Sequence, residues 1–368
     1  MKLLFYISTL EFGGAERVIA NLANQFANDI FSVYLVTTYP KGKEYPLNNN
    51  VKRYCLEKKH TNSAKVKSNL SRILSLRKLI KMISPDVVVT FLPEAIFRTL
   101  IATIGLSVPV IISVRNDPNK EYASKKYYQA QKLLFPLAKG YVFQTIDARN
   151  WFPKRIQKRS AIIINQVDPV FFSCIRKSED HYVAIGRLTK QKNYHMMIKG
   201  FKRFVSDHPC EKLLIYGDGE EKVKIEQLIR DYSLENNVRL MGKTDNVAEV
   251  LSHAKAFVMT SDFEGMPNAM LEAMAVGLPV IVTDCPCGGP RMIIKNNVNG
   301  ILLPVNDVDS LYNALKRIEQ DTEFRKSISI QAMQTSRMFK PQVIYQQWKS
   351  YITKVAAECN YSAKSTKK

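Results

Sequence analysis

Two glutamates, Glu264 and Glu272, flank what looks like a loop followed by a helix. Gly265 and Pro267 lie between them, and proline suits the first position of a helix. The spacing predicts one carboxylate before the helix and the other one to two turns inside it, so both could contact different parts of one ligand. The alternative is that Glu264 caps the helix and Glu272 is merely solvated.

The first amides of that predicted helix belong to Asn268, Ala269 and Met270. The first N–H groups of a helix lack acceptors within it, and the helix dipole adds positive potential at the same end. Such a helix start is an anion site, so we expect these three amides to face an anionic ligand.

Two cations, Arg187 and Lys192, follow the apolar run at 182–185, with Gly186 leading into them. In open α/β sheets ligands bind beyond the carboxyl ends of the strands, which is where these cations would lie. A planar arginine fork and a lysine point charge suit a diphosphate. The alternative is a pair of surface cations in a strongly basic chain.

A pair of glycines, Gly13 and Gly14, follows the first apolar run, and Glu16 comes just after it. Glycine lets the backbone approach a ligand closely, and a helix is expected to start here. The segment lacks the G-x-G-x-x-G fingerprint of dinucleotide-binding proteins, so by itself it indicates little.

Short apolar runs that alternate with helical patterns would position these residues. The runs lie at 3–7, 32–37, 87–91, 110–114, 141–143 and 162–164 in the first half, and at 182–185, 213–216, 238–241, 256–259, 280–283 and 301–303 in the second. Such a pattern is typical of parallel sheets covered on both faces, so the sequence predicts an α/β protein with two Rossmann-like domains. We expect these domains at 1–170 and 171–345, followed by a helix end and a disordered basic tail at 346–368.

The net charge and the cysteine content indicate which kinds of partner and which compartment suit this chain. The formal net charge is +21, and residues 1–170 hold most of the excess, with 26 Lys and Arg against 11 Asp and Glu. This favours an anionic partner such as phosphate groups, nucleic acid or an acidic membrane surface. The six cysteines show neither zinc-site nor disulfide spacing, which fits a reducing cytoplasm, and no apolar run is long enough to span a bilayer.

Taken together, the polar segments resemble family 4 of the retaining glycosyltransferases over almost the whole chain, and bacterial enzymes of surface-polysaccharide, O-antigen and capsule synthesis in particular. Glu264 and Glu272 fit the E-x7-E pattern of that family, Arg187 and Lys192 fit its G-R-L-x-x-x-K pattern, and Gly13 to Glu16 fit its N-terminal glycine loop. The resemblance implies the GT-B fold, with two facing Rossmann-like domains and the active site in the cleft between them.

The resemblance also implies roles for the matched residues. Arg187 and Lys192 would bind the donor diphosphate and stabilise the leaving group. Gly14, Gly265 and the amides of Asn268, Ala269 and Met270 would assist, Glu272 would bind the ribose hydroxyls, and Glu264 would orient the donor sugar. The implied reaction moves a hexose or N-acetylhexosamine, with retention, from a nucleotide sugar (UDP rather than GDP). The positive charge of the first half adds the expectation that the acceptor is a glycan linked to a polyisoprenoid diphosphate.

One departure from the family concerns Arg115 and Asn116, since many relatives have a histidine where Arg115 stands. These two residues are candidates, with Gly13 and Glu16, for contacts with the sugar or the acceptor, and they leave the donor sugar open. No metal or other cofactor is expected. Asp307 and Asp309 have the D-x-D spacing of metal-binding transferases, but we interpret them as ordinary caps at a helix start.

A membrane contact is predicted from residues 65–83, which form a basic amphipathic pattern. Val66, Leu70, Ile73, Leu74, Ile80 and Ile83 would share one apolar face. Such a helix lies on anionic lipid or packs its apolar face on the sheet. We therefore expect a cytoplasmic protein that associates peripherally with the inner face of the plasma membrane.

Three other functions are compatible with some features of the sequence. A sugar-nucleotide epimerase has the same fold, but the glutamate and arginine-lysine patterns argue against it. A nucleic-acid-binding protein fits the charge, but the sequence contains no nucleic-acid motif. A transferase fold that only binds its ligand would not need every matched polar residue, and all of them are present.

Overall fold

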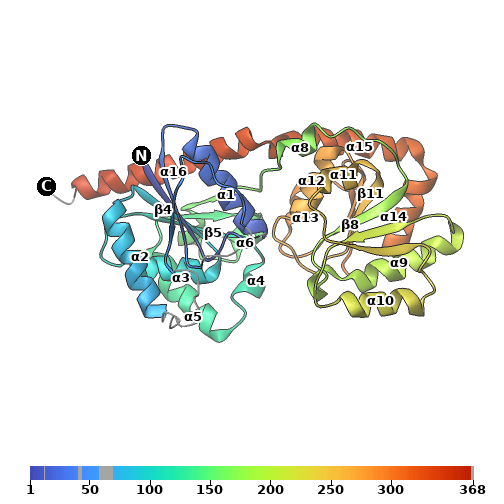
Figure 1. The fold of residues 1–368 in the computed structure, drawn as a ribbon, viewed down its shortest axis with the longest axis horizontal. Coiled ribbons are helices and arrows are strands. Elements are labelled where there is room, and N and C mark those ends of the chain that lie inside the picture. Colours follow the sequence, from blue (N-terminus) through green and yellow to red (C-terminus); the bar gives the residue numbers. More distant parts are fainter. Residues whose placement is uncertain (12, 40–43, 58–68, 366–368) are drawn as a thin grey trace. The chain divides into compact units, whose positions relative to one another are not determined.

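The computed structural model describes the chain except residues 12, 40–43, 58–68 and 366–368, together with the side chains of 360–365. It divides into two compact units (Figure 1). The first consists of Met1–Ile164 with Ile344–Lys368, and the second of Asn165–Val343.

Within the described residues, the first unit is built on a seven-stranded parallel sheet in the order β3-β2-β1-β4-β5-β6-β7. The strands are β1 (Lys2–Ile7), β2 (Ser32–Thr37), β3 (Lys52–Cys55), β4 (Val87–Phe91), β5 (Val110–Val114), β6 (Gly140–Phe143) and β7 (Ser160–Ile162). Every residue of the central strands β4 and β5 is buried, because helices cover both faces of the sheet. Polar groups at the strand ends are thus the ones left for chemistry.

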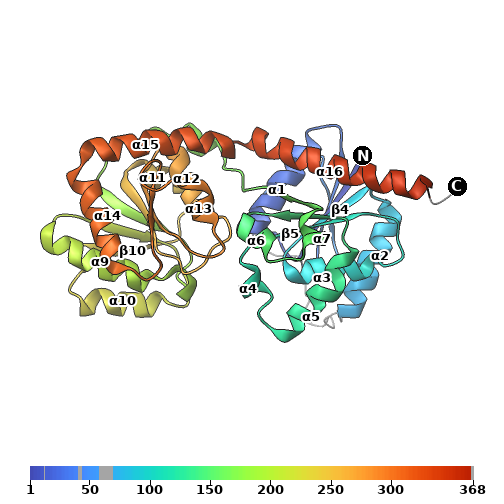
Figure 2. The ribbon, with the colours of Figure 1, turned by 180° about the vertical axis from the view of Figure 1, so that it is seen from behind.

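The helices of this unit cover the two faces of its sheet (Figures 1 and 2). They are α1 (Gly14–Ala27), α2 (Asn69–Ile83), α3 (Pro93–Ala102), α4 (Pro118–Glu121), α5 (Lys125–Leu134), η1 (Phe135–Leu137), α6 (Ile146–Asn150) and α7 (Lys154–Gln157). In Figure 1, α2 and α3 lie on one face, and α1 and α16 (Pro341–Ser365) lie on the other.

Within the second unit, a six-stranded parallel sheet has the order β10-β9-β8-β11-β12-β13 over the described residues. The strands are β8 (His181–Ile185), β9 (Leu213–Tyr216), β10 (Val238–Gly242), β11 (Ala254–Met259), β12 (Val280–Thr283) and β13 (Ile301–Leu303). The helices are α8 (Pro169–Phe172), η2 (Lys190–Lys192), α9 (Tyr194–Asp207), α10 (Lys222–Asp231), α11 (Val247–Ser252), α12 (Asn268–Val276), α13 (Gly289–Ile293), α14 (Val308–Gln320), α15 (Thr322–Ser336) and η3 (Arg337–Phe339). All six strands coincide with the predicted apolar runs to within two residues.

The last helix, α16, returns to the first unit. Its Trp348 is fully buried and stacks on Phe91 of β4, with ring centroids 5.8 Å apart. Tyr345 and Lys349 donate to the carboxylate of Asp29, over 2.5 and 2.7 Å. The helix continues to Ser365, through much of the segment expected to be disordered, and residues 366–368 lie outside the described part.

One strand was not predicted, and one local expectation was wrong. Strand β3 (KRYC) was missed because it is an edge strand without an apolar run, whose residues are half-buried or exposed. Of the pattern predicted over 65–83, residues 65–68, Val66 among them, lie outside the described part of the chain. The apolar residues of α2 do not share one face: Ile80 and Ile83 are buried, whereas Leu70 and Leu74 are 66% and 56% exposed. The helix packs on the unit through one stripe and presents leucines to solvent through another.

Candidate active site

The two polar segments of the second unit meet in one ion pair. Nζ of Lys192 lies 2.6 Å from Oε1 of Glu264, and the two side chains are only 16% and 11% exposed. The hydroxyl of Ser261 donates to the same carboxylate oxygen over 2.9 Å. Because Lys192 follows β8 and Glu264 follows β11, the pair joins the carboxyl ends of two adjacent parallel strands. Glu264 does not cap α12, whose N-cap is Pro267.

The loops that carry this pair are fastened to each other by further hydrogen bonds. The amide of Asp262 donates to the carbonyl of Gln191 over 2.8 Å, and the side-chain amide of Gln191 donates to the carbonyl of Phe263 over 2.9 Å. The side-chain amide of Asn193, a left-handed residue with φ 45°, donates to the carboxylate of Asp262 over 2.7 Å. These bonds fix the position of the ion pair.

The loop after β12 supports Glu264 from a third side. The amide of Glu264 donates to the carbonyl of Pro286 over 2.5 Å, and the amide of Cys287 donates back to the carbonyl of Glu264 over 2.8 Å. A Cβ on Gly289 would lie 1.8 Å from the carbonyl oxygen of Gly265, so only glycine fits there. Burial and the charge of Glu264 raise the pKa of the Cys285 thiol to about 12. That thiol is therefore a neutral packing group at neutral pH.

A second glycine contact supports the loop that holds Arg187. A Cβ on Gly217 would lie 1.9 Å from the carbonyl oxygen of Gly186, and one on Gly219 would lie 2.3 Å from that of Leu188. The amide of Leu188 donates to the carbonyl of Asp218 over 2.9 Å. Arg187 itself is exposed. The predicted cation pair thus comprises one fixed, paired lysine and one exposed arginine on a braced loop.

Helix α12 begins at Asn268, one residue after the position expected from Pro267. It has no side-chain N-cap, so its first amides, at Asn268, Ala269 and Met270, have no acceptor within the helix. Glu272 is 5% exposed, which rules out the alternative that it is simply solvated. Carboxylates are rarely buried in proteins unless they are paired, so the burial of Glu272 sets it apart from a solvated surface residue.

Asn165 is a neighbour of α12 that the sequence analysis did not single out as a site residue. Its side-chain amide donates to Oδ1 of Asn268 over 2.6 Å and to the carbonyl of Met266 over 3.2 Å, and it is 4% exposed. It therefore orients the first residue of α12. Ser261 and Asn193 were also missed as site residues. Their positions could have indicated a role in the site, because Ser261 follows β11 and Asn193 ends the loop after β8.

The remaining acidic candidates are explained locally. Asp307 caps α14, since its side chain accepts from the amide of Ser310 over 2.8 Å and from the hydroxyl of Ser310 over 2.6 Å. These hydrogen bonds lower the pKa of the Asp307 carboxyl. Asp309 pairs with Arg203 on α9. The interpretation of Asp307 as a helix cap is confirmed. Over the described residues, no group of three or more His, Cys, Asp or Glu side chains is arranged to hold a metal ion.

In the first unit, Gly13 and Gly14 lie where the chain enters α1 after β1. Gly13 is the N-cap and Gly14 the first helical residue, close to the predicted start. A Cβ on Gly13 would lie 2.2 Å from Oε2 of Glu16, so the Glu16 carboxylate folds back over this glycine. The Glu16 side chain thus lies beside Gly13, whereas Gly14 is exposed.

Arg115 follows β5 and is 9% exposed. Its guanidinium lies over the ring of Phe91, 4.9 Å from the centroid, and donates to the hydroxyl of Ser113 over 3.3 Å. Burial lowers the pKa of Arg115 and raises the pKa of Glu121, while each charge favours the charged form of the other. Asn116, beside it, is half-buried.

Comparison with known proteins follows the two-unit division. Residues 12–170 match the model of Glycosyltransferase Family 4, and residues 171–335 match the model of Glycosyl transferases group 1. A Campylobacter jejuni enzyme that adds N-acetyl-D-galactosamine in α-1,4 linkage to an undecaprenol-diphosphate-linked glycan is 27% identical over 362 residues, 96% of this chain and 99% of that one. An uncharacterized glycosyltransferase of Methanocaldococcus jannaschii is 32% identical over 62% of this chain and 63% of that one.

Among solved structures, Anabaena HepE in complex with UDP and glucose superposes with a TM-score of 0.78, at 18% identity over 96% of this chain and 100% of that one. At this identity the similarity concerns the fold. The expectation of two Rossmann-like domains of the GT-B class is confirmed.

Proposed function

Because this chain belongs to family 4 of the glycosyltransferases, we propose that it transfers a hexose or N-acetylhexosamine from a UDP-sugar, with retention, to a glycan carried on a polyisoprenoid diphosphate. The observation that carries the donor half of the proposal is the partly buried pair of Lys192 and Glu264 at the carboxyl ends of β8 and β11. The UDP complex of the HepE neighbour and the lipid-linked acceptor of the Campylobacter relative support the choice of substrates.

We propose that binding of the donor separates this ion pair and gives each of its two members a new partner. Lys192 and Arg187 would bind the diphosphate, since a lysine point charge and an arginine fork both suit phosphate oxygens. Glu264 would then be released from Lys192 and would accept from a hydroxyl of the donor sugar. The ion pair thus keeps both groups charged and positioned before the donor arrives.

The remaining donor contacts follow the same proposal. The first amides of α12 would donate to the diphosphate, and Glu272, inside α12, would accept from the ribose hydroxyls. Positive charge from Lys192, Arg187 and the helix start would stabilise the leaving diphosphate, so the reaction would need no metal ion. The leaving phosphate would act as the base on the same face of the sugar, and neither Glu264 nor Glu272 would be a nucleophile.

We propose that residues of the first unit also contact the substrates. Gly14 would let the backbone approach the donor, and Gly13, Glu16, Arg115 and Asn116 would contact the sugar or the acceptor. Arg115 is held by Phe91 and Ser113 and is thus a fixed rather than a mobile cation.

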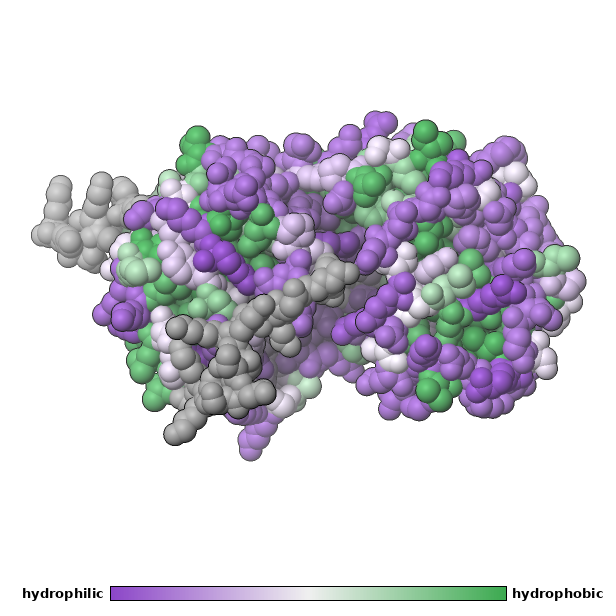
Figure 3. Space-filling view, viewed as in Figure 1, coloured by the Kyte–Doolittle hydropathy of each residue, from purple (hydrophilic) through white to green (hydrophobic). Residues whose placement is uncertain are grey.

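We also propose that the first unit docks on anionic lipid at the inner face of the plasma membrane. Leu70, Leu74 and Met82 are exposed on α2 by 66%, 56% and 64%, and the exposed Lys78 and Lys81 lie on the same helix. Hydrophobic residues lie among hydrophilic ones over the α2 edge of this unit (Figure 3). Exposed apolar side chains beside cations are what an anionic membrane surface attracts.

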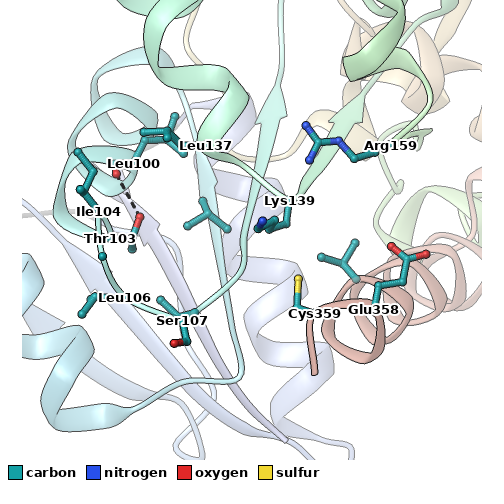
Figure 4. A pocket seen from close by; sticks show the side chains of 14 residues that line it. Leu100, Thr103, Ile104, Leu106, Ser107, Leu137, Lys139, Arg159, Glu358 and Cys359 are labelled. Atoms are coloured by element: carbon teal, nitrogen blue, oxygen red, sulfur yellow. Dashed lines mark hydrogen bonds between the residues drawn. The ribbon is translucent and has the colours of Figure 1, made fainter. Parts of the chain in front are cut away.

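A pocket of about 500 Å³ lies at the end of α3. Figure 4 shows Leu100, Ile104 and Leu106 on one side of it and Arg159 and Glu358 on the other. Arg77 of α2 donates to the carbonyls of Ala102 and Ile104 and so ties α2 to this rim. None of the described helices is both long and apolar enough to cross a membrane.

The donor proposal is tested by measuring nucleotide release from a panel of UDP- and GDP-sugars, with and without undecaprenyl-diphosphate-linked glycan acceptors, on the wild type and Glu264→Gln. A single preferred UDP-sugar, with release that depends on the acceptor and is lost in Glu264→Gln, is expected. Conversion of the sugar nucleotide without any acceptor would favour an epimerase instead, and silence with every donor and acceptor would overturn the proposal.

A further inference from the structure

A second pocket of the first unit has a volume of about 810 Å³ and is formed by the chain segments that follow β5 and β6. Helices α4, α5 and α7 and the segments next to them line it. The lining residues are Asn119, Tyr122, Ala123, Tyr128, Gln131, Lys132, Pro136, Trp151, Phe152, Pro153, Arg155 and Ile156. Its volume is within the range of small-molecule sites, and its lining combines aromatic rings, amides and cations.

The aromatic part of the lining is a rigid platform. Trp151 stacks on Tyr122 with centroids 6.0 Å apart and meets Tyr128 edge-on at 6.1 Å. The indole Nε1 donates to Oδ1 of Asn119 over 2.8 Å, and the side-chain amide of Asn119 donates to Asp117 over 3.2 Å. The indole is therefore fixed in orientation. Because Tyr128 is 37% exposed and Trp151 is partly exposed, ring surface remains for a ligand.

The polar part of the lining is positive. Lys132 lies over the ring of Tyr128, with Nζ 4.8 Å from the centroid, and Arg155 lines the pocket from α7. Both side chains belong to exposed residues, and none of the lining residues is an aspartate or glutamate. A ligand with an anionic group beside an apolar ring face complements this arrangement. Cations that face phosphate oxygens and aromatic faces that stack on a sugar ring provide the two matching contacts.

The pocket is also connected to the strand end that carries Arg115. Asp117 follows it by two residues, caps α4 and accepts from Asn119, which holds Trp151. The hydroxyl of Tyr122 is buried and has no hydrogen-bond partner within the described residues, so this lining residue keeps an unused polar group. The platform thus belongs to the same continuous segment of the chain as Arg115 and Asn116, two of the residues proposed to contact the sugar or the acceptor.

We propose that this pocket binds the sugar-diphosphate portion of the acceptor, with the pyranose on Trp151 and Tyr128 and the diphosphate bound by Lys132 and Arg155. The inference rests on the proposed function, because it names the acceptor site of the same transferase. It places specificity for the lipid-proximal sugar in the segment from α4 to α7 of the first unit.

Fluorescence tests the site independently of catalysis. The chain has two tryptophans, and Trp348 is fully buried in contact with Phe91. In a Trp348→Phe variant, emission therefore reports Trp151 alone. The probe is N-acetylglucosamine linked through a diphosphate to farnesol, compared with free N-acetylglucosamine and inorganic pyrophosphate. We expect a saturable change with the linked sugar, at an affinity at least about tenfold higher than with either part, equivalent to about 1.4 kcal/mol.

Substitutions of residues that line the pocket test whether the probe binds there. Tyr128→Ala and Lys132→Gln should each weaken binding of the probe by roughly fivefold or more, whereas Lys126→Gln, on the exposed face of the same helix, should not. Equal affinity for inorganic pyrophosphate would overturn the sugar platform, and unchanged affinity in both lining variants would overturn the site.

If Trp348→Phe does not fold, the KM for the same probe in the native background gives the same comparison between Tyr128→Ala and Lys126→Gln. Acceptor-dependent nucleotide release by the wild type tests the proposed function separately. Its absence would point to failure of the transferase assignment, and its presence with no effect of the lining variants would point to failure of this site.

Discussion

Nζ of Lys192 and Oε1 of Glu264 lie 2.6 Å apart at the carboxyl ends of two neighbouring strands, and both groups are largely shielded from water. Truncating one member of such a pair leaves the other charge desolvated and without its partner, at a cost of several kcal/mol. The pair therefore contributes to the local fold as well as to the proposed donor site. Variants at the two positions should differ in a way that separates these contributions.

Glu264→Gln keeps the shape of the side chain and a hydrogen-bond acceptor but removes the charge opposite Lys192. We expect kcat for transfer to fall by about 10²–10³, as when a preorganised electrostatic contact is removed from a transition state. UDP affinity should fall much less, because Lys192 remains available to the diphosphate. Steady-state kinetics combined with UDP titration measure both effects, and a large loss of UDP affinity at unchanged kcat would contradict the assigned role.

Gly289→Ala should disrupt the site indirectly, through the loop that carries Glu264. The new Cβ would lie 1.8 Å from the carbonyl oxygen of Gly265 and must displace the loop that carries Glu264. We expect a loss of at least about 2 kcal/mol in the free energy of unfolding, together with weaker UDP binding. Gly105→Ala is the control, since its Cβ meets no atom within 4 Å, although its φ of +71° is also strained. Chemical denaturation that shows equal losses in both variants would contradict the contact.

Lys255 is a structural ion-pair residue of the second unit. It is 8% exposed, and Nζ lies 2.8 Å from a carboxylate oxygen of Glu211 and 2.6 Å from one of Glu319. Lys255→Ala should lower the free energy of unfolding by about 3–5 kcal/mol, because two partly buried carboxylates lose their shared cation. Lys177→Ala, which removes an exposed pair with Glu249, should cost about 1 kcal/mol or less. A loss in Lys255→Ala no greater than in this control would contradict the assignment.

Attachment of α16 to the first unit should depend on acid. Hydrogen bonds from Lys349 and Tyr345 hold the pKa of Asp29 at about 2, below its ordinary value of 3.8. A carboxyl with a depressed native pKa stabilises the fold above its unfolded pKa and loses that contribution as the pH falls from about 4 towards 2. The protection of α16 amides, measured against the intrinsic exchange rate at each pH, should therefore decrease over this range in the wild type. In Asp29→Asn the protection should already be lower at neutral pH and show a smaller change, whereas identical profiles would contradict the anchor.

Membrane docking should depend on the exposed face of α2. The double variant Lys78→Glu and Lys81→Glu should reduce binding to vesicles that contain phosphatidylglycerol, since each basic residue near an anionic surface contributes about 1 kcal/mol. The double variant Lys199→Glu and Lys202→Glu, at two exposed positions on α9 of the second unit, is the control with the same change of charge. Cosedimentation at low salt that is equal for both proteins, or absent for the wild type, would contradict the docking proposal.

The sequence predicted the strands of the second unit because buried parallel strands are continuous apolar runs. It did not predict β3, whose Lys52 and Arg53 face an exposed sheet edge. It also did not predict the return of α16, because its contacts with Asp29 and Phe91 join residues more than two hundred positions apart. No local pattern encodes such a pairing.

The candidate site shows the same division. The motif residues Lys192 and Glu264 could be found from spacing, but their direct pairing could not. Ser261 supports Glu264 within one loop, whereas Asn193 and Asn165 contact residues that lie 69 and 103 positions away in the sequence. These last two contacts exist only in the folded second unit. The close approach of Gly289 to the carbonyl oxygen of Gly265 likewise joins two different loops, and no local pattern in the sequence encodes it.

Calorimetric titration of UDP into the wild type, Lys192→Ala and Lys190→Ala tests the central claim most directly. Lys190 lies in the same short helix, η2, and is exposed, so it controls for charge and location. We predict that the wild type and Lys190→Ala bind UDP alike, and that Lys192→Ala binds at least about tenfold more weakly, a difference of about 1.4 kcal/mol. Equal affinity in Lys192→Ala, or no UDP binding by the wild type, would contradict the assignment of this ion pair to the donor site.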